Sequence, residues 1–340
     1  MRFAAIGLDH RHIYDLTREL QAAGATCAGF SPETTDPRVL AGFRERFPDV
    51  PEAEKNRLLD DPAIDFIVSA AVPRDRAPLA VDAMRRGKDV MVDKPGLVIP
   101  EDVEAVERAV RETGRIFSIC FSERFLTPST GTALSLARDG AIGRVIQTVG
   151  LGPHRLNRPL RPDWFFDVAH YGGILVDIAS HQIDQFLVFT GSTEAEILAS
   201  TAENRATPES PRFQDFGEIL LRSGPASGYI RVDWFTPDGL ATWGDGRLFV
   251  LGTEGTIELR KYIDIAGRPG KDHLFLVDRK GTRHFDCSDE PLTFFRAFLD
   301  DLRNRTETAM PQSHVFAVSR LALEAQARAR GSSPASGDSP

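Results

Sequence analysis

The first thirty residues read MRFAAIGLDHRHIYDLTRELQAAGATCAGF, and this stretch decides the fold of the amino-terminal part of the chain. The apolar run Arg2–Gly7 predicts a strand, and the pattern across His12–Ala23 predicts a helix. Ala25–Phe30 is a second apolar run of strand length. Two short strands joined by one helix are the unit from which parallel sheets are built.

The same alternation continues to residue 121. Further strands are predicted at Asp65–Ala70, Lys88–Val92 and Ile116–Phe121, and helices at Pro37–Phe47, Ala77–Arg86 and Pro100–Thr113. Residues 1–121 are therefore predicted to form an α/β domain, a doubly wound parallel sheet with helices on both faces. Ligands of such sheets bind beyond the carboxyl ends of the strands.

After residue 121 the pattern changes. Helices are predicted at Pro128–Asp139, Ile174–Thr190, Pro291–Arg303 and His314–Arg328, and strands at Arg144–Leu151, Ala195–Thr201, Phe213–Arg222, Ala226–Trp234, Leu248–Gly252, Thr256–Arg260 and His273–Asp278. Because few helices separate the later strands, we expect a large open sheet of mixed or antiparallel pairing. Residues 122–330 are predicted to form an α+β domain for substrate binding and oligomerisation, and residues 331–340 a disordered tail.

Composition excludes several classes of protein. The 340 residues are 41% hydrophobic and 26% charged, with a net charge of −8, which is ordinary for a globular protein and gives no basic footprint for nucleic acid. No apolar stretch is long enough to span a membrane, and the amino terminus does not read as a signal peptide. The three cysteines are far apart and odd in number, so we expect packed thiols in a reducing cytoplasm.

The turn after the first strand reads Gly7-Leu8-Asp9-His10-Arg11-His12. A dinucleotide-binding turn reads G-x-G-x-x-G, so Gly7 matches, while Asp9 stands where the backbone approaches the pyrophosphate and His12 where the helix packs on the strand. Backbone N–H groups at a helix start can still bind an anion, and His10 or Arg11 could add a phosphate contact. The alternative is that these side chains are solvated turn residues.

The second strand ends in Phe30-Ser31-Pro32-Glu33. Ser31 stands where an acid commonly binds the adenosine ribose, and a serine tolerates the additional phosphate of NADP. No basic cluster follows, and Glu33 is either a contact or a surface residue. The choice between NAD and NADP therefore stays open.

The fourth strand ends in Asp93-Lys94-Pro95. A lysine at the carboxyl end of a parallel strand points into the ligand crevice, where its ammonium can stabilise a developing alkoxide. Asp93 could orient or offset that charge, and Pro95 would restrict the backbone. Taken alone, such a tripeptide is also common in surface turns.

A carboxylate and an imidazole occur four residues apart at Asp177 and His181, within a predicted helix that opens at Gly172-Gly173. This spacing puts them on one helical face, and histidine suits proton transfer near neutral pH. An isolated pair of this kind is usually a surface pair. The apolar neighbours here predict a partly buried pocket instead, with Asp184 bracing that face.

These motifs together resemble the glucose–fructose oxidoreductase, inositol dehydrogenase and rhizopine-catabolism (Gfo/Idh/MocA) family over about residues 2–330. Gly87-Lys88-Asp89-Val90 followed by Asp93-Lys94-Pro95 resembles the family pattern G-K-H-V…E-K-P. Gly172–Asp177 leading to His181 resembles G-G-G-x-L-x-D-x-x-x-H. Further matching segments are Ser122–Phe125, Gly140–Gly143 and Leu251–Thr256. The resemblance implies a Rossmann dinucleotide-binding domain followed by an α+β domain.

The resemblance also implies roles for individual residues. Lys94 would hydrogen-bond the reacting hydroxyl, His181 would take its proton, and Asp177 would orient the substrate and tune His181. The nicotinamide cofactor, NAD or NADP, would exchange a hydride with the substrate carbon. The expected cofactor contacts are Gly7, Asp9, His10, Arg11, His12, Ser31, Pro73 and Lys94. Asp93 replaces the usual glutamate, and the glycine turn is depleted.

Side chains rich in hydrogen-bond donors flank the implied pocket and suit a sugar, polyol or sugar acid. The candidate substrate contacts are Arg124, Arg161, Trp164, His170 and Tyr171, with His154 and Arg155 nearby. Most of them taken individually also read as solvated loop residues. Apart from the pair His10 and His12, the histidines show no ligand spacing, so no metal site is predicted.

The sequence thus predicts a cytoplasmic NAD(P)-dependent dehydrogenase or reductase that acts on the CH–OH group of a sugar, polyol or related small substrate. The alternatives are a non-catalytic regulator that senses a dinucleotide or metabolite on the same fold, and a redox-assisted glycosidase or epimerase. A broad sheet face carrying Tyr229, Val232, Trp234 and Phe249 predicts a homodimer or homotetramer, unless helices cover it.

Overall fold

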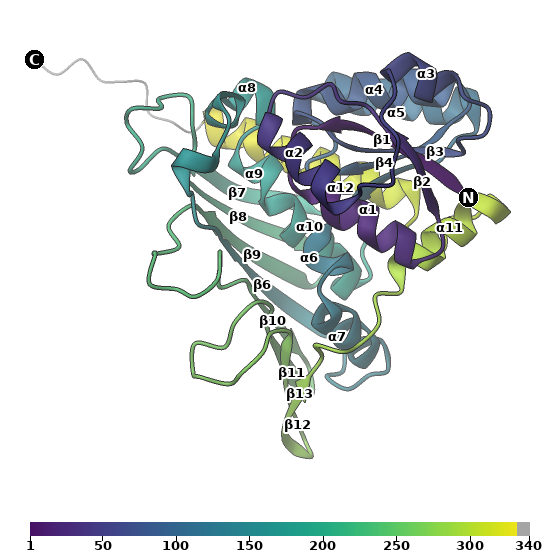
Figure 1. The fold of residues 1–340 in the computed structure, drawn as a ribbon. Helices are drawn as coiled ribbons and strands as arrows, with labels where there is room; N and C mark the ends of the chain where they lie inside the picture. Colours follow the sequence, from purple (N-terminus) through teal and green to yellow (C-terminus); the bar gives the residue numbers. More distant parts are fainter. Residues whose placement is uncertain (332–340) are drawn as a thin grey trace, which may run out of the picture. The chain divides into compact units, whose positions relative to one another are not determined.

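The computed structural model describes residues 1–331, and these divide into two compact units (Figure 1). The first unit contains residues 1–125, 162–172 and 292–319. Of the described residues, the second contains 126–161, 173–291 and 320–331. Each unit therefore combines segments that are far apart in the sequence. The predicted tail, residues 331–340, lies outside the described residues except for Gly331.

The first unit is built on a five-stranded parallel sheet in the order β2-β1-β3-β4-β5, which confirms the doubly wound prediction. The strands are β1 (Arg2–Leu8), β2 (Thr26–Phe30), β3 (Phe66–Ala70), β4 (Asp89–Asp93) and β5 (Phe117–Cys120). Every residue of β3, β4 and β5 is buried, because helices cover both faces of the sheet. The carboxyl ends of β1 and β4 lie at the same edge, with β3 between them.

Helices flank this sheet on both sides, with α4 and α5 on one face and α1 and α11 on the other (Figure 1). The helices of this unit are α1 (His12–Ala22), α2 (Pro37–Arg46), α3 (Lys55–Asp60), α4 (Pro73–Arg85), α5 (Pro100–Thr113), α6 (Ser122–Phe125), η2 (Asp163–Phe166), α8 (Val168–Tyr171) and α11 (Phe294–Asn304). A proline occupies the first turn of α2, α4 and α5, where its missing N–H costs no hydrogen bond. The short helix α3 was not predicted.

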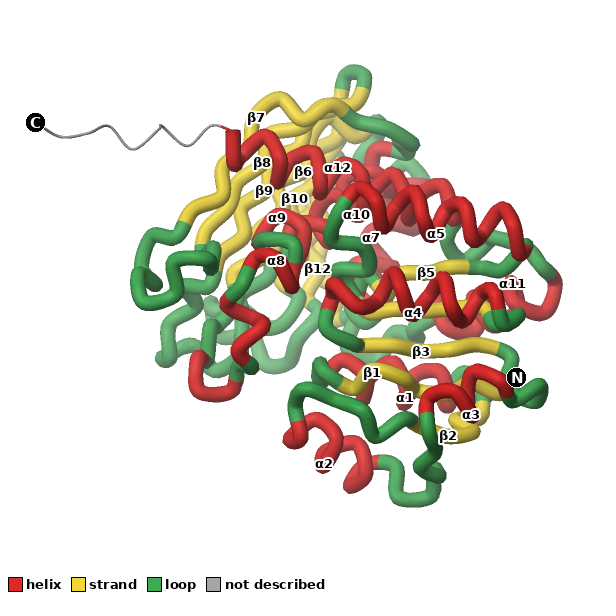
Figure 2. The backbone as a smooth tube through the Cα atoms, turned by 90° about the horizontal axis from the view of Figure 1, so that it is seen from above, coloured by secondary structure: helices red, strands yellow, loops and turns green. Residues whose placement is uncertain are grey.

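The second unit is built on an eight-stranded sheet in the order β13-β12-β11-β10-β6-β9-β8-β7 (Figure 1), and Figure 2 draws strands of this sheet in yellow. Its strands are β6 (Val145–Pro153), β7 (Glu196–Glu203), β8 (Phe216–Ser223), β9 (Ala226–Asp233), β10 (Arg247–Gly252), β11 (Gly255–Arg260), β12 (His273–Asp278) and β13 (Gly281–Asp286). Neighbours pair antiparallel except β6 and β9, which pair parallel. The prediction of a large mixed sheet is confirmed, and β13 adds a strand that was not predicted.

One face of this sheet is covered by helices. The helical elements of the unit are α7 (Pro128–Arg138), η1 (Arg158–Leu160), α9 (Ile174–Asp177) and α10 (Ala179–Thr190), and α12 (Gln312–Gly331) ends in it. Helices α7, α9 and α10 pack on the face that carries Ile219, Ile230, Leu248, Leu259 and Leu274, all at most 1% exposed. This face forms the core of the unit.

The opposite face of the sheet carries a row of residues paired in register across seven strands. The row consists of Leu220, Tyr229, Val149, Phe249, Glu258, Phe275 and His284. Tyr229 and Phe249 therefore share a face, as predicted, but Val232 does not, because three residues separate it from Tyr229 and strand side chains alternate. Val232 is 0% and Trp234 6% exposed, so placing these two on the open face was wrong.

No helix within residues 1–331 is long and apolar enough to cross a membrane.

Candidate active site

The bend that leads out of β1 begins at Gly7, the next-to-last residue of that strand, whose φ of +76° lies in the left-handed region. A Cβ at this position would lie 2.4 Å from the Cβ of Ala71, in the loop after β3. Only glycine meets both conditions. The turn therefore fits the first glycine of a dinucleotide-binding loop, which needs a tight bend between strand and helix.

The carboxylate of Asp9 is 7% exposed and joins the loops that follow β1, β2 and β3. Its Oδ1 accepts hydrogen bonds from the Thr34 hydroxyl (3.0 Å), the Thr35 hydroxyl (2.8 Å) and the Thr35 N–H. Its Oδ2 accepts one from the N–H of Val72 (3.2 Å). A negative charge thus occupies the loop that usually approaches the pyrophosphate, and like charges in one site repel. The turn fits a dinucleotide, and Asp9 is the departure that weakens the fit.

The other predicted cofactor contacts differ in exposure. Ser31 is fully buried at the end of β2, and its hydroxyl accepts the N–H of Glu33 (3.4 Å). Pro73 is buried at the start of α4. Arg11 precedes α1 with an exposed side chain. Of these three residues, Arg11 alone presents a charge to solvent.

His10 and His12 converge on the carboxylate of Asp93, the last residue of β4. The His12 Nδ1 lies 2.9 Å from Asp93 Oδ1, and the His10 Nδ1 lies 3.4 Å from Asp93 Oδ2. Burial, and next the neighbouring His12, lower the pKa of His10 to about 3. Burial alone raises the pKa of Asp93, but His12, His10 and Arg76 outweigh it and hold the pKa well below 3.8. The cluster therefore contains an ionised carboxylate and a neutral His10 near neutral pH.

Arg76, on the first turns of α4, is a positioning residue that the sequence analysis missed. Its guanidinium is 1% exposed, and its Nη1 donates to the backbone oxygens of Asp93 (2.7 Å) and Pro95 (2.8 Å). Its Nε donates to the Ala71 oxygen (2.7 Å), and its Nη2 lies 3.4 Å from Asp93 Oδ2. One buried cation thus clamps the backbone on both sides of Lys94, which is itself 7% exposed. No sequence signal distinguished Arg76 from the other arginines of that helix.

In the second unit, Asp177 and His181 lie on two successive helices, a short one and a longer one, rather than on one continuous helix. Asp177 ends α9, Ile178 interrupts the helix, and His181 is in the first turn of α10. The side chains of Asp177 and His181 are 6% and 2% exposed. The predicted burial is confirmed, although the single helix across Ile174–Thr190 was wrong at Ile178.

Side-chain amides hold this pair of segments. The Gln214 Oε1 accepts the N–H of Ile174 (3.0 Å), and the Gln326 Oε1 accepts the N–H of Leu175 (3.3 Å). A Cβ on Gly173 would lie 2.2 Å from that Gln326 oxygen, and its φ is +101°, so this glycine is required. Two orphan N–H groups at the start of α9 are satisfied in this way.

A buried lysine is linked to the His181 backbone through a glutamine side chain. Lys261, which follows β11 and is 1% exposed, donates from its Nζ to the Gln185 Oε1 (2.8 Å). The Gln185 Nε2 in turn donates to the His181 backbone oxygen (2.8 Å). Nothing in the sequence pattern distinguished Lys261 or Gln185 from ordinary strand-end and helix residues.

The predicted substrate contacts are divided between the units. Arg124, Trp164, His170 and Tyr171 belong to the first unit, and Arg161 belongs to the second. Tyr171 is 1% exposed and stacks on Phe165, with ring centroids 6.1 Å apart. The Arg161 guanidinium lies over the Trp234 ring, and its Nε donates to the Leu156 oxygen (2.9 Å). Lys94 lies in the first unit, and Asp177 and His181 lie in the second.

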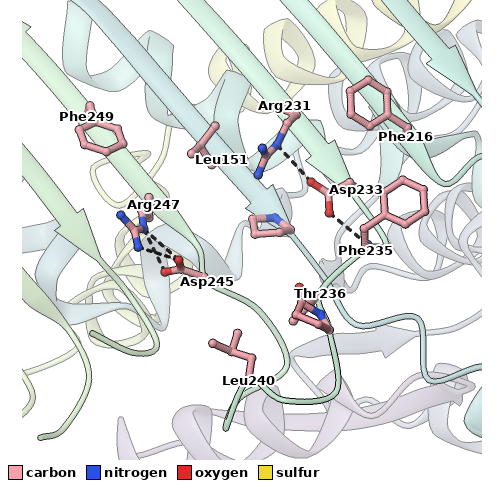
Figure 3. A pocket seen from close by; sticks show the side chains of 12 residues that line it. Leu151, Phe216, Arg231, Asp233, Phe235, Thr236, Leu240, Asp245, Arg247 and Phe249 are labelled. Carbon is pink, nitrogen blue, oxygen red and sulfur yellow. Dashed lines mark hydrogen bonds and ion pairs between the residues drawn. The ribbon is translucent and has the colours of Figure 1, made fainter. Parts of the chain in front are cut away.

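A cavity of about 550 Å³ lies on the uncovered face of the second unit's sheet (Figure 3). Two ion pairs project into it, Arg231 with Asp233 (3.1 Å) and Arg247 with Asp245 (2.8 Å). Leu151 lines this cavity, whereas its neighbours Gly150 and Gly152 face Gln182 of α10. The cavity is therefore on the other side of the sheet from the helix that carries His181.

The first unit is a doubly wound parallel sheet with a left-handed glycine at the end of its first strand and a buried lysine after its fourth. The second unit is built on a large mixed sheet. This combination is typical of two-domain oxidoreductases that bind a dinucleotide. A family model described as an oxidoreductase family with an NAD-binding Rossmann fold matches residues 32–121. A second model, the GFO/IDH/MocA C-terminal domain, matches residues 131–258. The chain belongs to the Gfo/Idh/MocA family of oxidoreductases. The first match leaves out β1 and the Gly7 turn, which is where the chain departs from the usual glycine pattern.

Two of three similar proteins match 90% or more of the chain, and the third matches 65%. A crystal structure of a protein from Erwinia carotovora atroseptica, assigned as an oxidoreductase, is 48% identical with a TM-score of 0.93 and covers 97% of this chain and 98% of that chain. The scyllo-inositol 2-dehydrogenase (NAD(+)) of Bacillus subtilis is 24% identical over 90% of this chain and 85% of its own length. The levoglucosan dehydrogenase of Pseudarthrobacter phenanthrenivorans is 28% identical over 65% of this chain and 53% of its own length.

Proposed function

We propose that this chain transfers a hydride between NAD or NADP and the CH–OH group of a sugar, polyol or related small hydroxylated substrate. Membership of the oxidoreductase family supports this proposal, and so do the inositol and levoglucosan activities in the names of its relatives. When bound, the nicotinamide ring supplies the hydride acceptor or donor. The Gly7 turn would hold the dinucleotide at the edge of the first unit's sheet.

The proposed division of roles assigns one step to each side chain. Lys94 donates a hydrogen bond to the reacting hydroxyl and stabilises the negative charge that develops on its oxygen. His181 accepts the hydroxyl proton, since an imidazole suits proton transfer near neutral pH. Asp177 orients the substrate and tunes the basicity of His181. These roles require the three side chains to act on one substrate.

The observation that carries the proposal is the clamped Lys94 turn. Lys94 is 7% exposed, so its ammonium loses much of its hydration and depends on partners that the site supplies. Arg76 fixes the backbone oxygens of Asp93 and Pro95 on both sides of Lys94, at 2.7 and 2.8 Å. Such a brace limits the positions that the ammonium can reach, as catalysis by a positioned donor requires.

Trp164 provides support for the predicted substrate contacts. Its indole nitrogen is buried and has no hydrogen-bond partner among residues 1–331. A buried tryptophan N–H usually finds an acceptor, and a substrate oxygen is an acceptor of the required kind.

The experiment compares two buried lysines at opposite ends of β4. Lys94→Met should lower kcat about 10²–10³-fold with a panel of polyols and NAD⁺ or NADP⁺, because it removes a donor to the developing oxyanion. Lys88→Met is the matched control. The Lys88 Nζ donates to the backbone oxygens of Asp61 (2.6 Å) and Ile64 (2.8 Å), so its loss should lower Tm and leave kcat within a few-fold. A folded Lys94→Met enzyme with near-normal kcat would contradict the assigned role.

A second candidate function is a non-catalytic sensor of a dinucleotide or metabolite on the same fold. The buried Asp9 carboxylate favours this candidate, because it adds a negative charge to the loop that would meet a pyrophosphate. Calorimetry with NAD⁺, NADH, NADP⁺ and NADPH, combined with the polyol panel, separates the two. Dinucleotide binding without turnover of any substrate would favour the sensor.

Two further properties belong to this proposal. We assign the chain to the cytoplasm, because none of its three cysteines, all buried and all described, forms a disulfide. We also assign it a homodimer or homotetramer that forms through the uncovered face of the second unit's sheet. Leu220, Leu251 and Val277 on that face are 40–45% exposed.

A further inference from the structure

Three metal-binding side chains meet at one edge of the first unit's sheet. His10 lies in the turn after β1, His12 begins α1, and Asp93 ends β4, which is separated from β1 by β3. One ligand atom from each of the three lies within 4.8 Å of the others. Among residues 1–331, no other group of three histidine, cysteine or acidic side chains comes together in this way.

We propose that His10, His12 and Asp93 bind a divalent transition metal ion, with Zn²⁺ as the best-matched ion. Two imidazole nitrogens and one carboxylate oxygen are a donor set that Zn²⁺ and its neighbours Co²⁺ and Ni²⁺ accept. A tetrahedral ion with bonds of about 2.0–2.2 Å separates its ligand atoms by roughly 3.3–3.5 Å. The His10 Nδ1 to Asp93 Oδ2 distance of 3.4 Å meets that requirement. The His12 Nδ1 and the Asp93 Oδ1 are 2.9 Å apart because a hydrogen bond joins them. A bound ion would take the place of the proton between these two atoms.

The surrounding residues hold the ligands in place. Asp93 is 1% exposed, and its carboxylate lies 3.4 Å from the Arg76 Nη2, so it keeps its orientation without the ion. Outer contacts of this kind are typical of metal ligands. The two imidazole rings are perpendicular, with centroids 4.2 Å apart, and direct their Nδ1 atoms toward opposite oxygens of the one carboxylate.

The carboxylate of Asp93 has more partners than a single ion pair provides. Arg76 already gives Asp93 a buried cationic partner at 3.4 Å, and the two imidazoles are additional partners of the same carboxylate. An ion can also reach the site, because the side chains of His10 and His12 are 22% and 32% exposed. Three protein ligands leave a coordination position for water or a substrate oxygen, as in catalytic zinc sites.

The test titrates Zn²⁺ and Co²⁺ into the full-length chain after dialysis against a chelator, with neither dinucleotide nor substrate present. We expect one ion per chain by calorimetry, and a Co²⁺ absorption spectrum of a site with nitrogen ligands. His10→Ala and His12→Ala should each weaken binding by more than the roughly 10–100-fold that outer partners of a site contribute. Both rings are partly exposed, so we expect His10→Ala and His12→Ala to keep the fold even if Asp93→Asn does not. The Tm of each variant verifies that it is folded.

The matched control is His284→Ala. His284 also contacts a second histidine, with its Nε2 3.1 Å from the His273 Nδ1, so it tests whether any histidine pair binds the ion. Unchanged binding in His284→Ala, together with loss in both cluster variants, supports the site. Absence of stoichiometric binding by the wild-type chain, or equal losses in all three variants, overturns it. Because no turnover is measured, this result is independent of whether Lys94 is catalytic.

Discussion

At the scale of single residues, Asp9 decides how the Gly7 turn meets a dinucleotide. Gly7 keeps the bend that the fold requires, since its Cβ would collide with Ala71. Two residues later, a carboxylate takes the N–H groups of Thr35 and Val72 into internal hydrogen bonds. The loop is thus stabilised from within by a charge of the same sign as a phosphate.

Replacing Asp9 with glycine should therefore tighten dinucleotide binding. Removing one negative charge near a pyrophosphate is worth roughly 1–2 kcal/mol at the dielectric of a protein surface, or about tenfold in Kd. Calorimetry with NADH and NADPH measures the change. Asp9→Asn keeps the shape of the side chain and should give part of the gain, and Asp15→Asn on α1 is the control for net charge. Weaker binding by both Asp9 variants would mean that the carboxylate organises the site rather than opposing the cofactor.

Arg76 is the residue on which the Lys94 turn depends most directly. We expect Arg76→Met to lower the free energy of unfolding by about 3–5 kcal/mol, because it leaves Asp93 buried without its cation. Urea unfolding measures this loss. Arg74→Met on the same helix is the control, since the exposed Arg74 Nη1 makes a single contact with the Ala169 oxygen at 3.2 Å and should cost under 1 kcal/mol. Equal losses of unfolding free energy in Arg76→Met and Arg74→Met would show that the buried contacts of Arg76 add no stability.

At the scale of secondary-structure elements, Asp301 organises the connection from α11 to α12. Its carboxylate accepts hydrogen bonds from the Thr306 hydroxyl (2.6 Å), the Thr308 N–H (2.9 Å) and hydroxyl (2.7 Å), and the Ala309 N–H (2.7 Å). Burial alone raises the pKa of Asp301, but these hydrogen bonds outweigh it and lower the pKa below 3.8. Because the folded pKa is lowered, the stabilisation is present above pH 3.8 and is lost as pH falls through the folded pKa.

Asp301→Asn should accordingly reduce stability by about 1–3 kcal/mol at pH 7, because it weakens the four hydrogen bonds to this charged acceptor. The difference from wild type should stay constant down to about pH 5 and shrink below pH 3.8. Chemical unfolding at a series of pH values measures it. Asp300→Asn, whose side chain is 53% exposed, is the neighbouring control. A difference that does not change with pH would exclude the assigned charge effect.

Element prediction succeeded where the pattern is local. Pro100–Thr113 was predicted at its observed bounds, because a proline begins it, Gly114 ends it in the left-handed region and Val103, Val106 and Ala109 repeat at helical spacing. The break at Ile178 was missed, since its cause lies outside the segment. The amides that hold α9 in place belong to Gln214 and Gln326, which no local pattern connects to it.

At the scale of the whole molecule, the uncovered sheet face is the surface that assembly would use. Light scattering at micromolar concentration should give twice or four times the mass of one chain. Phe249→Asp, in the middle of the register row, should shift that mass toward the monomer, because a charge in a desolvated interface costs several kcal/mol. Ile265→Asp is the control, since Ile265 is 60% exposed in the loop between β11 and β12. A monomeric wild-type chain would rule out this assembly.

The sequence determined most of the elements and the family they belong to, with α3 and β13 among the exceptions. Strands and helices can be predicted from the period at which apolar residues recur in the local sequence. The Lys94 and Asp177–His181 motifs can be recognised from residue types at fixed spacing. The face of a strand residue also follows from local alternation, and Val232 was misplaced by not applying that rule.

Only the tertiary structure decided which distant side chains meet. His10 and His12 reach Asp93, and Arg76 turns inward to clamp the residues around Lys94, because parallel strands bring the loops at their carboxyl ends to one edge of the sheet. These contacts join residues up to 83 positions apart. Their geometry depends on strand order and crossover, which no local pattern of residue types encodes.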